Sequence, residues 1–139
     1  MPMSDTADLQ KKLDAEIAPV CTALTPHTVE HADRKKGEVK LRFSPQPAFE
    51  NHFGNIQGGF AAAMVDVLVS TAVFANSGKW LPTVEIKSTF LSPLKLDYSI
   101  GEANIIKAGR RLIFLEAKIW SADEKLAVHA TATVANSQS

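Results

Sequence analysis

The sequence has a single cysteine, Cys21, which excludes a disulfide within the chain. It also has no excess charge of either sign, because fifteen lysines and arginines balance fifteen aspartates and glutamates. A chain with zero formal net charge has no overall field to attract nucleic acid or an anionic membrane. The N-terminal stretch MPMSDTADLQKKLDAE lacks an apolar signal core, so we expect a cytoplasmic protein.

The chain is predicted to fold as one domain. Its 139 residues match the usual size of a domain, its 45% hydrophobic content suffices for a core, and no repeat or linker divides it. In residues 1–20, Leu9, Leu13 and Ile17 recur at every fourth position before the helix-breaking Pro19. This spacing predicts a short N-terminal amphipathic helix.

Six segments have the composition of β-strands and are separated by turn residues. The first two, HTVEHAD and EVKLRF, flank the polar turn RKKG and are predicted to form a hairpin. The other four follow a long apolar stretch and are LPTVEIKSTFLS, LKLDYSIGEANIIKA, RRLIFLEAKIWSA and KLAVHATATVAN.

Residues 58–76 form the apolar stretch and are predicted to be a central helix. The run from Phe60 to Ala75 is shorter than the about 20 apolar residues that cross a bilayer, and it contains a charge. One hydrophobic helix among strands favours an α+β domain in which a curved antiparallel sheet wraps the helix. The N-terminal helix is expected to cover an edge or end of this sheet.

The charge in the central helix is Asp66. An unpaired carboxylate in a core costs several kcal/mol, so this one must be hydrogen-bonded, protonated, or facing a cleft or a subunit boundary. It is either a structural aspartate satisfied by a nearby backbone group or lysine, or a functional acid. The sequence of the helix alone leaves both interpretations open.

The helix is predicted to begin at the pair Gly58 and Gly59. Glycines leave the first N–H groups uncovered at the positive end of the helix dipole, where a developing oxyanion can be held. Removing one such donor typically lowers a rate ~10²- to 10³-fold. The alternative is that the two glycines only permit close packing against a strand.

The segment that contains these residues resembles a family signature. NHFGNIQGG at residues 51–59, with Asp66 seven positions after Gly59, resembles the Asn-x-x-Gly-x-x-His-Gly-Gly…Asp pattern of hotdog-fold acyl-CoA thioesterases of the phenylacetate-pathway (PaaI-like) group. The likeness extends over roughly residues 38–135. It includes the strand and turn TVEIKSTFLSPLK, the hairpin IKAGRRLIFLEAKIW and the last strand KLAVHATATV.

This resemblance implies a hotdog fold and an acyl-CoA thioesterase. Two subunits would pair their sheets side by side, often with two dimers in a homotetramer, and the active sites would lie at the dimer interface. Asp66 would act as nucleophile or general base, and the Gly58 N–H of the other subunit would polarise the thioester carbonyl. Asn51 matches an amide that orients water or the carboxylate. Thr83 falls where some relatives have a hydroxyl near this acid, or is an ordinary strand residue.

Coenzyme A is part of the expected substrate, and neither a separate cofactor nor a metal is expected. The resemblance places Arg110 and Arg111 near the coenzyme A phosphates, although solvated charges at a tight turn explain them equally well. A carboxylate and an oxyanion donor suffice for a thioester, so no metal is needed. His27 and His31 lack the geometry of helical metal ligands and are interpreted as surface or hairpin residues.

One position departs from the family pattern, because Gln57 replaces the usual histidine. Glutamine can donate and accept hydrogen bonds but does not titrate near neutral pH. The first hypothesis is therefore an acyl-CoA thioesterase, with Gln57 as a fixed hydrogen-bonding residue. The alternative is a non-catalytic module that binds acyl-CoA or acyl-carrier protein. A hotdog dehydratase fits less well, because its pair of histidine and acid is not recognised.

Overall fold

The computed structural model describes residues 3–16, 18, 24 and 27–136. The helices and strands follow the order predicted from the sequence. They are α1 (Asp5–Ala15), β1 (His27–Asp33), β2 (Glu38–Phe43), the 3-10 turn η1 (Pro47–Phe49), α3 (Gly58–Ser77), β3 (Thr83–Phe90), β4 (Ser99–Ala108), β5 (Leu112–Ser121) and β6 (Leu126–Ala135).

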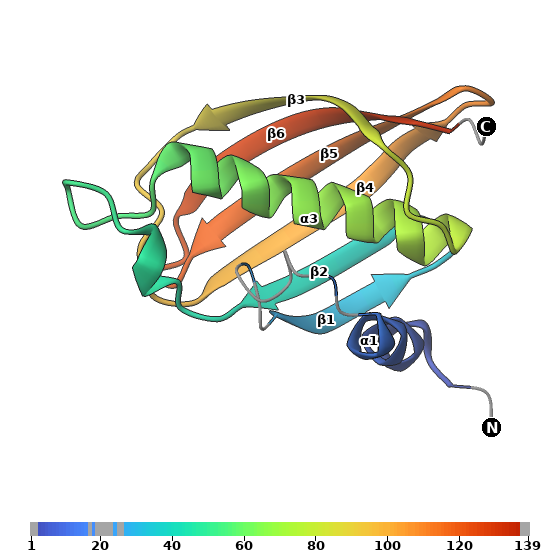
Figure 1. Ribbon diagram of the computed structural model, residues 1–139, viewed down its shortest axis with the longest axis horizontal. Helices are drawn as coiled ribbons and strands as arrows, with labels where there is room; N and C mark the ends of the chain where they lie inside the picture. Colours follow the sequence, from blue (N-terminus) through green and yellow to red (C-terminus); the bar gives the residue numbers. More distant parts are fainter. Residues whose placement is uncertain (1–2, 17, 19–23, 25–26, 137–139) are drawn as a thin grey trace.

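The six strands form one antiparallel sheet in the order β1-β2-β4-β5-β6-β3. Figure 1 shows α3 lying along one face of this sheet, which curves around it from β1 to β3. The strands therefore wrap the long helix, as the sequence predicted.

The core lies between α3 and the sheet. Met64, Val65, Leu68 and Val69 on α3 are completely buried. A side chain at Gly101 on β4 would come within 2.6 Å of a Leu68 methyl carbon, so this glycine lets the helix approach the sheet. Close packing of this kind makes α3 the centre of the hydrophobic core.

The helix α3 is longer than the apolar run suggested. It has 20 residues and ends at Ser77. The next residue, Gly78, is a left-handed cap with a φ of 75°, and its N–H donates to Phe74 O. By length and composition α3 could cross a membrane, so the expectation that it is too short was wrong. Half of its most apolar window is buried within the chain, as in the core helix of a folded domain.

The helix α1 covers the edge strand β1 (Figure 1). Side chains of α1 accept hydrogen bonds from backbone N–H groups of β1 and of the residue after it. Gln10 Oε1 accepts from Val29 N–H at 2.7 Å and Thr6 Oγ1 from Ala32 N–H at 3.0 Å. Asp5 Oδ2 accepts from Arg34 N–H at 2.8 Å. These bonds satisfy an edge that otherwise has unpaired donors. The expected cover is thus confirmed, while Ile17 and Pro19 lie outside the described residues.

The opposite edge strand, β3, has no such cover within the described part of the chain. Leu91 N–H donates to Ala127 O, so alternate N–H groups along β3 point toward β6. The N–H groups of Ile86, Ser88 and Phe90 therefore face the free edge. Val84, Phe90 and Leu91 are each more than half exposed. An exposed edge with free N–H donors is open to pairing with another strand.

Candidate active site

Asp66 is hydrogen-bonded by a side chain of the edge strand. Thr83, at the start of β3, is opposite the buried Val134 and so faces α3. Its Oγ1–H donates to Asp66 Oδ1 at 2.7 Å. The partner of the carboxylate among the described residues is this hydroxyl, whereas the structural interpretation required a backbone group or a lysine. Both residues are half-buried, so neither belongs to the fully buried core.

The start of α3 leaves backbone donors available. Gln57 is the cap residue, and its carbonyl accepts from Phe60 and Ala61, whereas its side chain makes no capping bond. The N–H groups of Gly58 and Gly59 have no acceptor in the part of the chain that the structure describes. A helix start with free N–H groups can receive an oxyanion.

Close packing within the chain does not require this glycine pair. A side chain added at Gly59 would meet nothing within 4 Å, and one at Gly58 would only touch the Phe90 ring at 3.4 Å. Neither glycine has a positive φ. The space beside Gly59 is therefore open, whereas the Phe90 ring lies beside Gly58.

Asn51 organises the loop that leads into α3. Its side-chain oxygen accepts from Phe53 N–H at 2.9 Å and from Asn55 N–H at 3.1 Å, and its own N–H donates to Asn55 O. Ile56 N–H in turn donates to Leu94 O, which ties the loop to the body of the domain. With its oxygen engaged, Asn51 has only its Nδ2 donors for an additional partner.

The predicted oxyanion donor and the predicted acid are far apart within one chain. Gly58 and Asp66 are eight positions apart on α3, which corresponds to about 12 Å along the axis. A single carbonyl group cannot contact both. The single chain thus brings Asp66 to Thr83 but does not bring Asp66 to Gly58.

Arg110 and Arg111 occupy the centre of a tight β4–β5 turn, which Gly109 N–H closes by donating to Leu112 O at 2.8 Å. Both side chains are exposed, and neither forms a salt bridge with a described residue. Figure 1 places this hairpin next to the C-terminal end of β6, at the end of the sheet opposite the loop that leads into α3.

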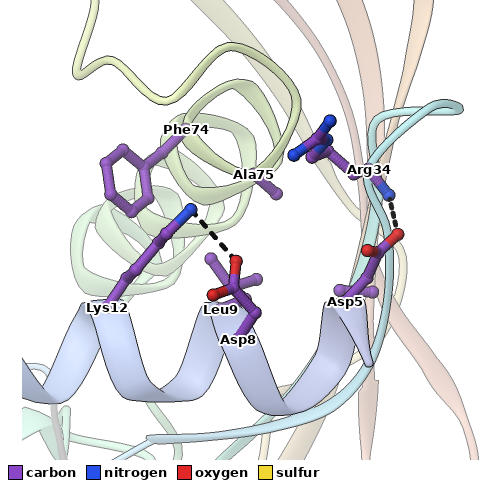
Figure 2. A pocket seen from close by; sticks show the side chains of 8 residues that line it. Asp5, Asp8, Leu9, Lys12, Arg34, Phe74 and Ala75 are labelled. Atoms are coloured by element: carbon purple, nitrogen blue, oxygen red, sulfur yellow. Dashed lines mark hydrogen bonds and ion pairs between the residues drawn. The ribbon is translucent and has the colours of Figure 1, made fainter. Parts of the chain in front are cut away.

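A small hollow lies elsewhere, between α1, the end of β1 and the last turns of α3 (Figure 2). Lys12 pairs with Asp8 at 3.0 Å, Asp5 accepts from Arg34 N–H, and Phe74 forms the opposite wall. The hollow has room for about one water molecule. It therefore belongs to the packing of α1 and offers no substrate site.

Three of the four histidines lie on strands of the sheet. No group of potential ligands large enough to hold a metal ion occurs among the described residues. Burial lowers the pKa of His27 in β1, whereas His31 on the same strand is exposed. His129 on β6 hydrogen-bonds Glu116 at 3.0 Å, and this bond lowers the pKa of the Glu116 carboxyl.

Comparison with known proteins identifies the family. The arrangement of one long helix wrapped by an antiparallel sheet is that of solved thioesterases, so the predicted hotdog fold is confirmed. The chain belongs to the Thioesterase superfamily, whose family model matches residues 53–128, more than half of the sequence. A search of curated proteins gave no significant match.

Three solved structures illustrate the likeness. A phenylacetic acid degradation-related protein of Ralstonia eutropha JMP134, described as a thioesterase, is 27% identical with a TM-score of 0.80, over 91% of this chain and 98% of its own. Thioesterase superfamily member 2 of Mus musculus is 20% identical with a TM-score of 0.82, over 98% and 100%. A hypothetical thioesterase of Streptococcus pneumoniae TIGR4, crystallised with coenzyme A, is 20% identical with a TM-score of 0.74, over 82% and 88%.

Proposed function

We propose that this protein is an acyl-CoA thioesterase, which hydrolyses a thioester to a free acid and coenzyme A. The observation that carries the proposal is the hydrogen bond from Thr83 to Asp66, which holds a carboxylate in an apolar helix beside an open strand edge. Membership of the Thioesterase superfamily supports it, as does the relative crystallised with coenzyme A.

The proposed site is formed by two subunits. If two β3 strands pair about a two-fold axis, the start of each strand lies beside the end of the other. Thr83, at the start, contacts Asp66, and Phe90, at the end, lies against Gly58. Pairing therefore brings the partner's Gly58 toward Asp66, across a gap that a single helix cannot close. We propose a homodimer as the minimal active unit, with a homotetramer of two dimers as the final assembly.

In the proposed reaction the partner's Gly58 N–H stabilises negative charge on the thioester oxygen. Asp66 either attacks the carbonyl carbon, forming an anhydride that water hydrolyses, or removes a proton from an attacking water. In both routes the C–S bond breaks, the coenzyme A thiolate leaves and takes up a proton, and one water molecule is consumed for each acid released. Asn51 Nδ2 orients the water or the carboxylate. The residues need no metal or separate cofactor for these steps.

The proposal is tested by turnover of a panel of short, long and aryl acyl-CoA substrates, followed by release of free thiol. We expect at least one substrate to be hydrolysed with release of coenzyme A in equal amount to the acid. Saturable binding of these acyl-CoAs without any thiol release would favour the non-catalytic binding module instead.

Substitutions of Gln57 distinguish a thioesterase from a non-catalytic binding module. We expect Gln57→Ala to lower kcat by about tenfold, a loss of about 1.4 kcal/mol, because its side-chain N–H would support the thioester in the transition state. Its side chain makes no capping bond, so α3 should remain intact. The rate should also show no ionisation near pH 6.5 that depends on position 57.

The contrary result has a distinct pattern. If Gln57→Ala leaves a low kcat and the KM unchanged and Gln57→His converts this sluggish protein into an active one, the proposed role of Gln57 is wrong. The natural protein would then be the binding module, with hydrolysis lost or much reduced together with the histidine.

Removing the Thr83 hydroxyl should lower kcat although Asp66 itself is unaltered. We expect Thr83→Val to lower kcat by about tenfold with little change in KM, because Asp66 loses the bond that orients it. The matched change Thr28→Val, at an exposed position of the remote strand β1, should leave kcat unchanged. Steady-state kinetics check both, and equal rates for Thr83→Val and the unaltered protein would show that orientation by Thr83 is dispensable.

A further inference from the structure

Asn136, immediately after β6, is bonded twice to the β4–β5 turn. Its N–H donates to Arg111 O at 2.8 Å, and its side-chain Nδ2 donates to Gly109 O at 2.8 Å. One residue from a distant part of the sequence thus holds the carbonyls on both sides of Arg110. Asn136 is itself half-buried, which limits competition from water for these bonds.

The turn that Asn136 holds has little freedom of its own. A side chain at Gly109 would come within 2.9 Å of the Leu112 carbonyl oxygen, so the two backbone segments approach as closely as glycine allows. Three cationic residues, Lys107, Arg110 and Arg111, project from this hairpin and are all exposed. None of them is in a salt bridge within the described residues. Such a cluster of cations without carboxylate partners suits an anionic ligand.

The same segment connects the turn to the candidate active site. Ala135 N–H, one residue before Asn136, donates to Pro82 O at 2.9 Å. Pro82 immediately precedes Thr83, whose hydroxyl is bonded to Asp66. The end of β6 therefore fixes the cationic turn on one side and the start of β3 on the other (Figure 1).

We infer that Asn136 is a positioning residue that presents Arg110 and Arg111 to the phosphates of a nucleotide-linked thioester. This inference rests on the proposed function, since the ligand is the coenzyme A portion of the substrate. A planar guanidinium binds phosphate best when its approach is fixed, so an anchored turn binds more tightly than a mobile one.

The test compares one acyl group on two carriers, coenzyme A and pantetheine, because pantetheine lacks all the phosphates. We expect Asn136→Ala to lower kcat/KM for the acyl-CoA about fivefold through KM, and to leave kcat/KM for the acyl-pantetheine unchanged. The increase of KM with added salt should become smaller. In the Arg110→Ala, Arg111→Ala background, Asn136→Ala should have no additional effect on KM.

A matched control is Asn76→Ala. Asn76 Nδ2 also donates to a backbone carbonyl, Arg34 O, at 2.8 Å, but at the remote β1–β2 turn. Asn76→Ala should lower the stability of the fold about as much as Asn136→Ala does, and it should leave KM unchanged for both substrates. The inference is overturned if Asn136→Ala lowers kcat/KM equally for acyl-CoA and acyl-pantetheine. It is also overturned if the double arginine variant has an unchanged KM for the acyl-CoA.

Failure of the proposed function gives a different pattern. If the unaltered protein hydrolyses neither substrate, the proposed function fails, and calorimetric titration with free coenzyme A tests Asn136 without turnover. The affinity should then fall about fivefold in Asn136→Ala and remain unchanged in Asn76→Ala. Equal affinities for coenzyme A in the unaltered protein, Asn136→Ala and Asn76→Ala overturn the inference.

Discussion

Asp66→Asn is expected to lower kcat/KM for the best acyl-CoA at least ~100-fold, within the range that a positioned acid or base contributes. Asparagine has nearly the same shape, and its side-chain oxygen can still accept the Thr83 hydroxyl, which is 2.7 Å from the aspartate oxygen. It cannot attack a carbonyl carbon or remove a proton from water. The chemical step should therefore be lost while the fold is preserved.

The measurement is the steady-state rate of thiol release, with thermal unfolding and sedimentation as checks on fold and assembly. Asp33→Asn is a matched control, because Asp33 Oδ1 accepts Lys36 N–H in the remote β1–β2 turn and asparagine can do the same. It should keep the full rate. Activity of Asp66→Asn within about twofold of the unaltered protein would exclude a catalytic role for this carboxylate.

Most of the fold was predictable from local patterns. Turn residues and the alternation of apolar and polar side chains predicted the β1–β2 hairpin. The glycine pair predicted the start of α3 at Gly58. The largest error in a strand boundary is at β4, because the fourth strand-like segment begins at Leu94 whereas β4 begins at Ser99. The alternating Leu94 and Leu96 resemble a strand, but their carbonyls accept from N–H groups of the loop that precedes α3.

The candidate site was predictable only in part, because its contacts join distant segments. Thr83 is 17 residues from Asp66, and only strand register and helix packing bring the hydroxyl to the carboxylate. The bonds from Asn136 to the β4–β5 turn span up to 27 positions and leave no local signal in the sequence. The sequence pattern identified the residue types of a site, and the fold determined which of them are in contact.

The proposed dimer can be tested by substitution of Ser88, in the middle of β3. Its N–H faces the free edge of the sheet, so proline there removes no bond to β6. Its hydroxyl oxygen is buried without a hydrogen-bond partner among the described residues, so loss of the side chain should cost little stability. Proline at this position would therefore block a second β3 strand while sparing the single chain.

We expect Ser88→Pro to be a folded monomer with kcat/KM lowered ~100-fold or more, because each Asp66 loses the partner's oxyanion donor. Ser88→Ala, which keeps the N–H, should remain dimeric and fully active. Sedimentation velocity and thiol release measured on the same samples check both variants, and Val84→Glu at an exposed position of β3 is an independent disruption. A monomer that retains the full rate would show that one chain contains the whole site. A dimer that persists in both Ser88→Pro and Val84→Glu would show that β3 is not the interface.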